Sequence, residues 1–386
     1  MTGSRWQRAA AVLPALALVA VAAACGGDDD DASTDAGTTP VASSPTTTGG
    51  TDVAGGDTGP SVAPADMSAD TAGGSAPATD GATLRVGYSA WPGWFPLAVA
   101  EEQGFFAEAG VDVELTFFVD YISSLDALAA GSIDVNTQTL NDTIFAVAAG
   151  SPQRVIATND NSTGNDAIIC DASITSVSDL AGKSIAAEPG VVDHFLLLQG
   201  LAEEGMSEAD IDFQGLPTAA AAAAFAGGEF DCVGVFAPFT VQALEREGSK
   251  VLFSSADFPG AISDHFVATA DAVADHPDEL QKLVDAWYLT IDWIEANPDE
   301  ATAIMAAKAD VTTEEYAEFA EGTTIFTAEQ ALDSFEDRAG DPTSLPEMAR
   351  RINPFLVESG LTEQEADLTD LFVPDYTSAY IESAGD

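Results

Sequence analysis

The sequence predicts an α/β protein made of two lobes, followed by a helical C-terminal tail. From Thr83 onward, short apolar runs typical of strands alternate with segments of helical periodicity. A second stretch that begins near Ala167 repeats this alternation, and after Phe266 the pattern is almost entirely helical. Because alternating strands and helices are typical of parallel sheets covered by helices on both faces, we expect parallel-rich sheets in each lobe.

The expected elements follow one another closely along the chain. In the first stretch we expect strands at 84–88, 111–118, 135–137 and 154–157, and helices at 96–109, 122–130 and 142–149. In the second stretch we expect strands at 167–170, 184–187, 232–236 and 251–254, and helices at 194–204, at 219–226 and up to Glu247. In the tail, Pro277, Pro298 and the pair Thr312 and Glu315 mark the starts of further helices.

The N-terminus has the pattern of a targeting segment. Arg5 and Arg8 precede an apolar run at 9–24, and Cys25 follows three alanines. Small residues before a cleavage point are typical of a secretory signal, and a Cys at the first mature position resembles a bacterial lipoprotein signal. We therefore expect a signal peptide at 1–24 and lipidation of Cys25, which would anchor the protein without a spanning helix. The alternative is a secreted protein in which Cys25 is incidental.

Composition then divides the rest of the chain. Residues 25–82 are rich in Gly, Ser, Thr, Pro, Ala and Asp and lack Lys and Arg, which predicts a disordered acidic linker. We expect lobe 1 to begin with 83–163, lobe 2 to occupy 164–263, and 264–386 to complete lobe 1 and add C-terminal helices. Loops at the carboxyl ends of the strands would then face each other across a cleft that closes on a solute by hinge motion.

The charge and the cysteines limit the possible functions. The chain has 12 basic and 64 acidic residues, a net charge of −52. This balance excludes nucleic-acid binding and electrostatic docking on anionic lipid. Cys170 and Cys232 lie in apolar, strand-like runs. An extracytoplasmic setting allows a disulfide between them, but we expect two buried free thiols.

Several sequence pieces match a family in the order in which the family has them. They are Leu84–Trp94 (LRVGYSAWPGW), Ala100–Phe106 (AEEQGFF), Ala129–Asp134 (AAGSID), Ser178–Lys183 (SDLAGK), Ala224–Asp231 (AFAGGEFD) and Phe236–Phe239 (FAPF). Over roughly 83–310 the chain resembles the substrate-binding proteins of nitrate-, sulfonate- and taurine-type ABC importers, which are grouped with thiamine-pyrimidine-binding proteins. The resemblance implies a type II periplasmic-binding-protein fold and delivery of a small solute to a permease and its ATPase, with no cofactor.

The candidate ligand residues lie in loops that follow the expected strands. Trp91 offers a flat face for stacking or for a cation, and Pro92 and Gly93 continue its loop. The others are Asn141, Asp142, Asp166, Phe236 and Asp264, together with Gly190, Val191, Asp193 and His194 in the turn that the resemblance assigns to ligand binding. The alternatives are that Trp91 and Phe236 only pack a core and that Asn141 and Asp142 only cap a helix. The dipeptides Asp193-His194 and Asp264-His265 have side chains that suit a metal ion, but we expect no metal site.

The absence of basic residues from these positions indicates the class of ligand. None of the ten Lys and Arg residues that follow the expected signal lies in a proposed cleft loop, whereas four aspartates do. This pattern favours a neutral or cationic, nitrogen-containing solute. The alternatives are a sulfonate, taurine or nitrate held by backbone N–H groups, and an enzyme like the related pyrimidine synthase, whose cysteine-rich motif is missing here. We expect a monomeric, lipid-anchored extracytoplasmic protein that is not an enzyme, serving transport or, alternatively, sensing.

Overall fold

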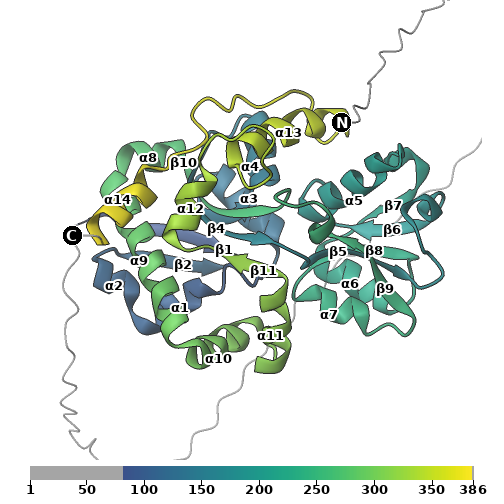
Figure 1. Cartoon of the computed structure of the whole chain (residues 1–386), viewed down its shortest axis with the longest axis horizontal. Helices are drawn as coiled ribbons and strands as arrows, with labels where there is room; N and C mark the ends of the chain where they lie inside the picture. Colours follow the sequence, from purple (N-terminus) through teal and green to yellow (C-terminus); the bar gives the residue numbers. More distant parts are fainter. Residues whose placement is uncertain (1–80, 385–386) are drawn as a thin grey trace, which may run out of the picture. The chain divides into compact units, whose positions relative to one another are not determined.

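The computed structural model describes residues 81–384, which contain two β-sheets with helices packed around them (Figure 1). The expected signal peptide, Cys25 and almost all of the expected linker lie outside these residues. Among the helices of the described part, none combines the length and the apolar character needed to cross a membrane.

The larger sheet has six strands in the order β11-β4-β10-β3-β1-β2. Its strands are β1 (Leu84–Tyr88), β2 (Val113–Phe117), β3 (Val135–Thr139), β4 (Gln153–Ser162), β10 (Ser263–Thr269) and β11 (Thr323–Ile325). Strand β1 runs parallel to β2 and β3, whereas β10 runs antiparallel to β3 and β4, and β11 antiparallel to β4. This sheet and the helices packed on it are called lobe 1.

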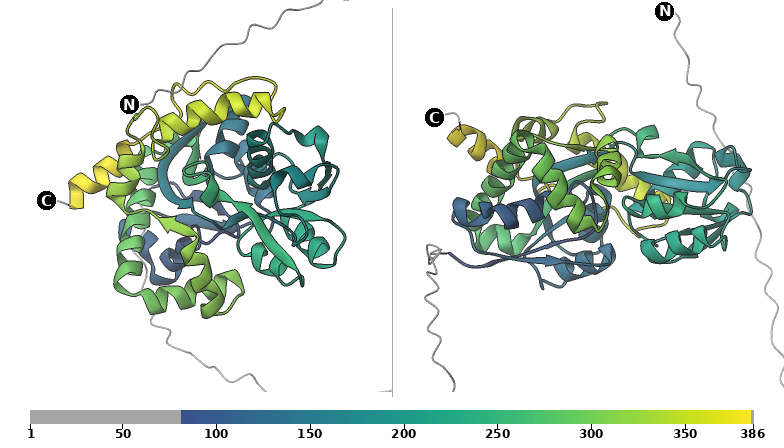
Figure 2. Two further views of the ribbon diagram at one scale, coloured as in Figure 1. Left: turned by 45° about the vertical axis from the view of Figure 1, so that its right-hand side comes forward. Right: turned by 90° about the horizontal axis from the view of Figure 1, so that it is seen from below.

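The smaller sheet has five strands in the order β7-β6-β8-β5-β9. Its strands are β5 (Asp166–Asp171), β6 (Ser184–Ala187), β7 (Asp212–Gly215), β8 (Cys232–Phe236) and β9 (Ser249–Ser254). Strand β6 is parallel to β7 and β8, and β5 is antiparallel to β8 and β9. This sheet and its helices are called lobe 2. The chain passes between the lobes twice, from β4 to β5 and from β9 to β10, as the views in Figure 2 show.

Both sheets are mixed, whereas the sequence predicts mainly parallel ones. The antiparallel pairs arise at the two crossings, because β5 and β10 each carry the chain away from the junction between the lobes while β3, β4, β6 and β8 run toward it. The sequence analysis also misses β7, β10 and β11. The two-lobed α/β class with a helical tail is confirmed.

Fourteen α-helices occur in the described residues, and most begin within two residues of the expected positions. They are α1 (Pro96–Gln103), α2 (Phe105–Ala109), α3 (Tyr121–Ala129), α4 (Leu140–Ala148), α5 (Val192–Glu203), α6 (Thr218–Ala226), α7 (Phe239–Leu244), α8 (Ala270–Asp275), α9 (Pro277–Ala296), α10 (Pro298–Ala309), α11 (Thr313–Glu321), α12 (Ala328–Ser334), α13 (Leu345–Glu358) and α14 (Asp375–Ala384). The helix expected at 96–109 is divided at Gly104, whose φ of 80° ends α1 in the left-handed conformation that glycine adopts without strain.

The tail helices brace lobe 1 and also reach lobe 2. Helix α9 buries its apolar face against lobe 1, where the Trp287 ring meets Phe266 of β10 edge to face at 5.0 Å. Helix α13 packs on α4, and its Phe355 ring lies 5.6 Å from Phe195 of α5 in lobe 2. The C-terminal helices are therefore part of the scaffold on both sides of the junction.

The expectation of free thiols is wrong, because Cys170 and Cys232 form a disulfide. The two residues are directly opposite each other in the antiparallel β5–β8 pair, with Cα atoms 4.1 Å apart. The sequence does not reveal this pairing, since 62 positions separate the two residues and nothing in the apolar pattern shows that their strands are neighbours.

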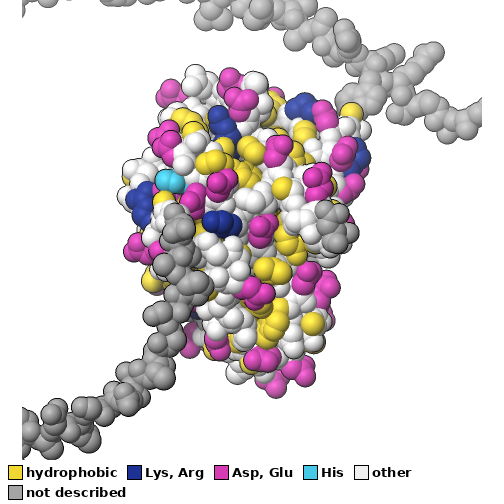
Figure 3. All heavy atoms as spheres, turned by 90° about the vertical axis from the view of Figure 1, so that its left-hand side faces the viewer, with side chains coloured by type: hydrophobic (Ala, Val, Ile, Leu, Met, Phe, Trp, Pro, Cys, Tyr) yellow, Lys and Arg dark blue, Asp and Glu magenta, His cyan; other side chains and the backbone are white. Residues whose placement is uncertain are grey.

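On the face of the molecule drawn in Figure 3, carboxylate side chains are scattered rather than gathered in one patch. Figure 3 shows this for the end of the molecule that lies at the left of Figure 1, where Asp and Glu are interspersed with a few Lys and Arg. Such a surface is that of a solvated acidic protein. The informative carboxyl groups are the buried ones between the lobes.

Candidate ligand-binding site

A small cavity lies where the two lobes meet. It forms at the carboxyl ends of β1, β3 and β8 and at the starts of β5 and β10, the edge at which ligands bind in open α/β sheets. Its free volume is about 10 Å³, room for about one water molecule, and it is lined by Trp91, Trp94, Tyr121, Thr139, Asp166, Val192, Phe236, Ile262 and Asp264. Both lobes contribute to this lining, so the cavity changes whenever the lobes move.

Four aromatic rings form much of the wall. The ring of Phe236, at the end of β8, meets Trp91 edge to face at 6.3 Å and Tyr121 at 6.2 Å. Trp94 lies 5.4 Å from Tyr121 on the same side. Phe236 belongs to lobe 2 and the other three rings to lobe 1, so these contacts join the lobes. Exposed ring faces in such a wall attract cations.

Six carboxyl groups are buried at and around the cavity, three from each lobe. Each residue is at most 3% exposed; they are Asp142, Asp160 and Asp264 in lobe 1 and Asp166, Glu188 and Asp193 in lobe 2. Within residues 81–384, no ion pair involves any of the six. Of the described Lys and Arg residues, none lines the cavity. A buried charge without a partner is costly, so this cluster demands either protons or a cation.

Asp160 and Asp264 form a pair of neighbouring buried carboxyl groups. They are opposite each other in the antiparallel β4–β10 pairing. The indole N–H of Trp91 donates to Asp160 Oδ1 at 2.8 Å. Burial raises the pKa of Asp160 to about 7, although the hydrogen bond from Trp91 opposes that rise. Burial and the charge of Asp160 hold the pKa of Asp264 well above its ordinary value, and the Oδ2 atoms of both residues are buried without a hydrogen-bond partner.

Asp142 is the best supported of the six. The Tyr121 and Thr139 hydroxyls donate to its Oδ2, and the Asn141 side chain donates to its Oδ1, each at 2.8 Å. Burial still raises the pKa of Asp142 to about 7, against the lowering effect of the bonds from Thr139 and Tyr121. Thr139 also caps α4 by accepting from the Asp142 N–H. Asn141 and Asp142 thus take part in the helix start and belong to the acidic cluster.

The carboxyl groups of lobe 2 have few donors. Burial raises the pKa of Asp166 to about 7, and its Oδ2 atom is buried without a hydrogen-bond partner. The hydroxyl oxygen of Thr218 lies 2.9 Å from both Glu188 and Asp193. Because one hydroxyl has one proton, it can donate to only one of these two groups. Burial and the charge of Asp166 hold the pKa of Asp193 well above its ordinary value, and burial raises the pKa of Glu188.

The structure brings most of the expected site residues to this junction. Trp91, Asp166, Phe236 and Asp264 line the cavity, and Asp193 is buried beside Thr218. A neighbouring groove between α3, α4 and the turn before α5 is lined in part by Asp142, Gly190 and Val191.

Three expected residues have other contacts. The Pro92 carbonyl accepts a hydrogen bond from the Tyr316 hydroxyl at 2.9 Å. Gly93 packs against the Asp160 carboxylate, which a Cβ atom at that position would overlap. The glycine is required because it allows the acid to approach the Trp91 loop.

His194 lies away from the cavity. Its Nε2 atom is 2.6 Å from Glu208, and its ring stacks on Phe213 with centroids 4.3 Å apart. Its Nδ1 atom accepts a hydrogen bond from the Gly190 N–H at 3.2 Å. His194 therefore positions the turn rather than facing the junction between the lobes.

Sequence reasoning missed several residues of the cluster, above all Asp160, Tyr121, Glu188 and Thr218. The expected strand at 154–157 ends before Asp160, whereas β4 continues to Ser162. A polar run directly after an apolar strand, here Thr158–Asn161, is the signal that could have revealed Asp160. Tyr121 and Thr218 stand at the first positions of their helices, where a side chain at the carboxyl edge of a sheet reaches the cleft.

The structure separates the two side chains of the Asp264-His265 pair. Successive side chains of a strand point to opposite faces, so Asp264 lines the cavity while His265 points away and bonds Ser263 at 3.0 Å. Burial lowers the pKa of His265 to about 3, which keeps its ring neutral. In the described part of the chain, no group of three His, Cys, Asp or Glu side chains is placed to hold a metal ion.

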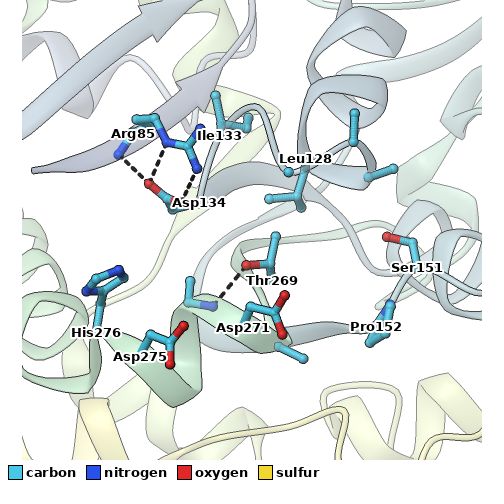
Figure 4. A pocket seen from close by; sticks show the side chains of 15 residues that line it. Arg85, Leu128, Ile133, Asp134, Ser151, Pro152, Thr269, Asp271, Asp275 and His276 are labelled. Atoms are coloured by element: carbon cyan, nitrogen blue, oxygen red, sulfur yellow. Dashed lines mark hydrogen bonds and ion pairs between the residues drawn. The ribbon is translucent and has the colours of Figure 1, made fainter.

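A second hollow lies at the opposite edge of the lobe 1 sheet (Figure 4). Its lining includes Arg85 at the start of β1 and Asp134 just before β3. The Arg85 guanidinium is bound to Asp134, with Nε donating to Oδ2 at 3.0 Å. This arginine is therefore engaged far from the junction between the lobes and offers no positive charge to the cluster there.

Comparison with known proteins places the chain among binding proteins. The family model described as NMT1/THI5 like matches residues 91–301, more than half of the 386 residues. A binding protein of Brucella abortus strain 2308 is 27% identical over 237 residues, 59% of this chain and 72% of that protein. The taurine-binding periplasmic protein of Escherichia coli K12 is 30% identical over 210 residues, 53% of this chain and 64% of that protein.

A solved structure with the same fold is the alkanesulfonate-binding protein SsuA of Xanthomonas axonopodis pv. citri, bound to MOPS. Its TM-score is 0.64 at 19% identity, and the match covers 77% of this chain and 99% of that one. The two-lobed architecture is therefore that of a periplasmic binding protein.

Proposed function

Because the chain belongs to the NMT1/THI5-like family, we propose that it is the solute-binding component of an ABC importer. Its two lobes enclose a small cavity, and the relatives described above are binding proteins, that of Escherichia coli a periplasmic one. Hinge motion of the lobes would capture the solute and present it to a permease and its ATPase. In this role the protein binds its solute and does not transform it.

The solute in this proposal is small, nitrogen-containing and neutral or cationic. The observation that carries the proposal is the cluster of six buried carboxyl groups, three from each lobe, in a wall of aromatic rings. An ammonium, amidine or amide N–H would supply the donors that Asp166 and Asp193 lack. Ring faces of Trp91 and Tyr121 would add cation–π attraction.

The competing ligands are taurine, other sulfonates and nitrate; the name of the relative from Escherichia coli makes taurine relevant. An anion would bind at a helix N-terminus that faces the junction between the lobes. The first turns of α4 and α5 hold Asp142 and Asp193 instead, and their carboxylates repel an anion. Taurine is the strongest competitor, because it carries an ammonium group as well as a sulfonate.

The proposal includes where the protein works and how its chain is divided. It is an extracytoplasmic monomer, lipidated at Cys25 after removal of 1–24 and held from the membrane by 25–82. Residues 83–163 and 264–386 make lobe 1, and 164–263 make lobe 2. Labelling with a lipid precursor, with Cys25→Ala as the control, tests the anchor.

Calorimetry on the wild-type protein at pH 8 tests the ligand class. The panel contains alkylamines, guanidines and amides on one side and taurine, alkanesulfonates and nitrate on the other. The account predicts binding by nitrogen donors and none by nitrate or simple sulfonates. Tight binding confined to the anions would refute it.

A further inference from the structure

The space between the lobes has two compartments. The inner one is the cavity described above. The outer one has a free volume of about 10 Å³, the size of one water or one ammonium group, and is lined by Ser89, Ala90, Val119, Asp120, Tyr121, Glu188, Thr218, Ala219, Phe236 and Phe239. Tyr121 and Phe236 belong to both linings, so their edge-to-face ring pair stands between the compartments. Val119 and Asp120 are exposed, which makes the outer compartment the one nearer solvent.

Each compartment has its own pair of carboxyl groups and its own unpartnered polar atom. Asp166 and Asp264 line the inner compartment, and Asp120 and Glu188 line the outer one. The Oδ2 atom of Asp166 is buried without a partner in the first, and the hydroxyl of Ser89 is buried without a partner in the second. Both residues are 1% exposed. Both compartments are thus prepared for a polar group that the described residues do not supply.

We propose that the ligand is a linear organic dication, a diamine whose two ammonium groups occupy the two compartments. This inference rests on the proposed function and narrows its ligand class. The inner ammonium donates to Asp166 and to the Asp160–Asp264 pair, and the outer one donates to Glu188 and Asp120. The methylene chain passes the rings of Tyr121 and Phe236, whose apolar surfaces suit it.

Two positive charges fit the cluster better than one. A single ammonium in the inner compartment would leave Glu188, which is buried, without a counter-charge, at the cost that buried charges carry. A bound metal ion would require three ligating side chains close together, which the described residues do not provide. Because the rings of Tyr121 and Phe236 separate the two groups of acids, the site favours a ligand with a cationic group at each end.

Calorimetry at pH 8 tests the proposal with 1,3-diaminopropane, 1,4-diaminobutane, 1,5-diaminopentane and 1,6-diaminohexane. Butylamine is the matched monocation, and taurine is the competitor. The best diamine should bind at least about 30-fold more tightly than butylamine, the penalty typical of leaving one charge of a buried pair without its partner. One chain length should be preferred, because the two acid pairs are held at a fixed separation.

Two variants separate the compartments. Glu188→Gln removes charge from the outer one and should weaken the best diamine about 30-fold while weakening butylamine much less. Asp166→Asn removes charge from the inner one and should weaken both ligands. Glu203→Gln, an exposed change in the same lobe, is the matched control and should alter neither affinity. Circular dichroism confirms that each variant is folded.

The outcomes distinguish the inference from the proposed function. Equal binding of butylamine and every diamine, or equal loss of both ligands in Glu188→Gln, would overturn the dication while leaving cation capture intact. Binding of taurine and sulfonates with no amine bound would overturn both. If amides alone bind, the dication is refuted and the nitrogen-containing solute stands.

Discussion

Lobe 1 and lobe 2 each bring three buried carboxyl groups to the junction, but they support them differently. In lobe 1, Tyr121, Thr139 and Asn141 donate to Asp142 and Trp91 donates to Asp160, while one oxygen each of Asp160 and Asp264 has no partner. In lobe 2, the Thr218 hydroxyl lies between Glu188 and Asp193, and one oxygen each of Asp166 and Asp193 has no partner.

This difference indicates a division of labour in binding. The three donors to Asp142 hold this acid in a fixed position before any solute arrives, which preorganises that part of the site. One oxygen each of Asp160 and Asp264 in lobe 1, and of Asp166 and Asp193 in lobe 2, needs a donor that comes from outside. A cationic solute held between the lobes would supply donors to both.

The two lobes also differ in what holds them together. Lobe 1 is braced by the tail helices, with Trp287 of α9 packed on Phe266 of β10. Lobe 2 has the Cys170–Cys232 disulfide across β5 and β8, strands that begin or end at Asp166 and Phe236 in the cavity wall. The covalent link thus stabilises the sheet from which lobe 2 presents its ligand groups.

Removing the disulfide should give the largest effect. In Cys170→Ala/Cys232→Ala, the free energy of unfolding should fall by about 4 kcal/mol, because a link between residues 62 apart restricts the unfolded chain. Urea denaturation measures the loss. Reductant should lower the stability of the wild type and leave that of the double variant unchanged. A double variant as stable as the oxidised wild type would show that the disulfide does not stabilise the fold.

The free protein should be less stable at pH 8 than at pH 5. Burial raises the folded-state pKa of Asp166 from 3.8 to about 7, so its stabilising contribution is present in acid and is lost as the pH rises through that range. Between pH 5 and pH 8, this group should lower the free energy of unfolding by roughly 3 kcal/mol. Opening of the lobes limits the decrease, because water then solvates the ionised carboxylate.

Thermal unfolding of Asp166→Asn at the two pH values measures this contribution. The variant should lose less stability than the wild type on going from pH 5 to pH 8. Asp275→Asn, at an exposed position, controls for the general repulsion of an acidic surface. The same pH dependence in wild type and Asp166→Asn would count against a buried, unpaired carboxyl group.

A smaller effect compares one donor in each lobe. Thr218→Val removes the hydroxyl shared by Glu188 and Asp193 with little change of shape, and should cost about 1–2 kcal/mol at pH 8. Trp91→Phe removes the donor to Asp160 alone. Urea titrations at pH 8 should therefore show a larger loss of unfolding free energy for Thr218→Val than for Trp91→Phe. The reverse order would contradict the comparison.

The sequence was sufficient for most of the elements of the two sheets and for part of the cavity wall. Strand ends located Trp91 and Phe236, because these positions follow directly from the apolar pattern. It was insufficient wherever the answer depends on which strands are neighbours. The disulfide, the antiparallel β10 and the Asp160–Asp264 pair all arise from pairings between segments far apart in the chain. His194 shows that neighbours in sequence can also be separated in function, because it follows Asp193 directly but contacts Glu208 instead of the cavity.

Proton release on binding tests the central claim most directly. At pH 7, the tightest-binding amine of the panel is titrated into the wild-type protein in two buffers of different ionisation enthalpy. A cation lowers the pKa of the acids around it, and Asp142, Asp160 and Asp166 have pKa values of about 7 in the free protein. The account predicts that about one proton or more leaves the protein for each amine bound. Proton uptake, or binding with no change in protonation, would contradict it.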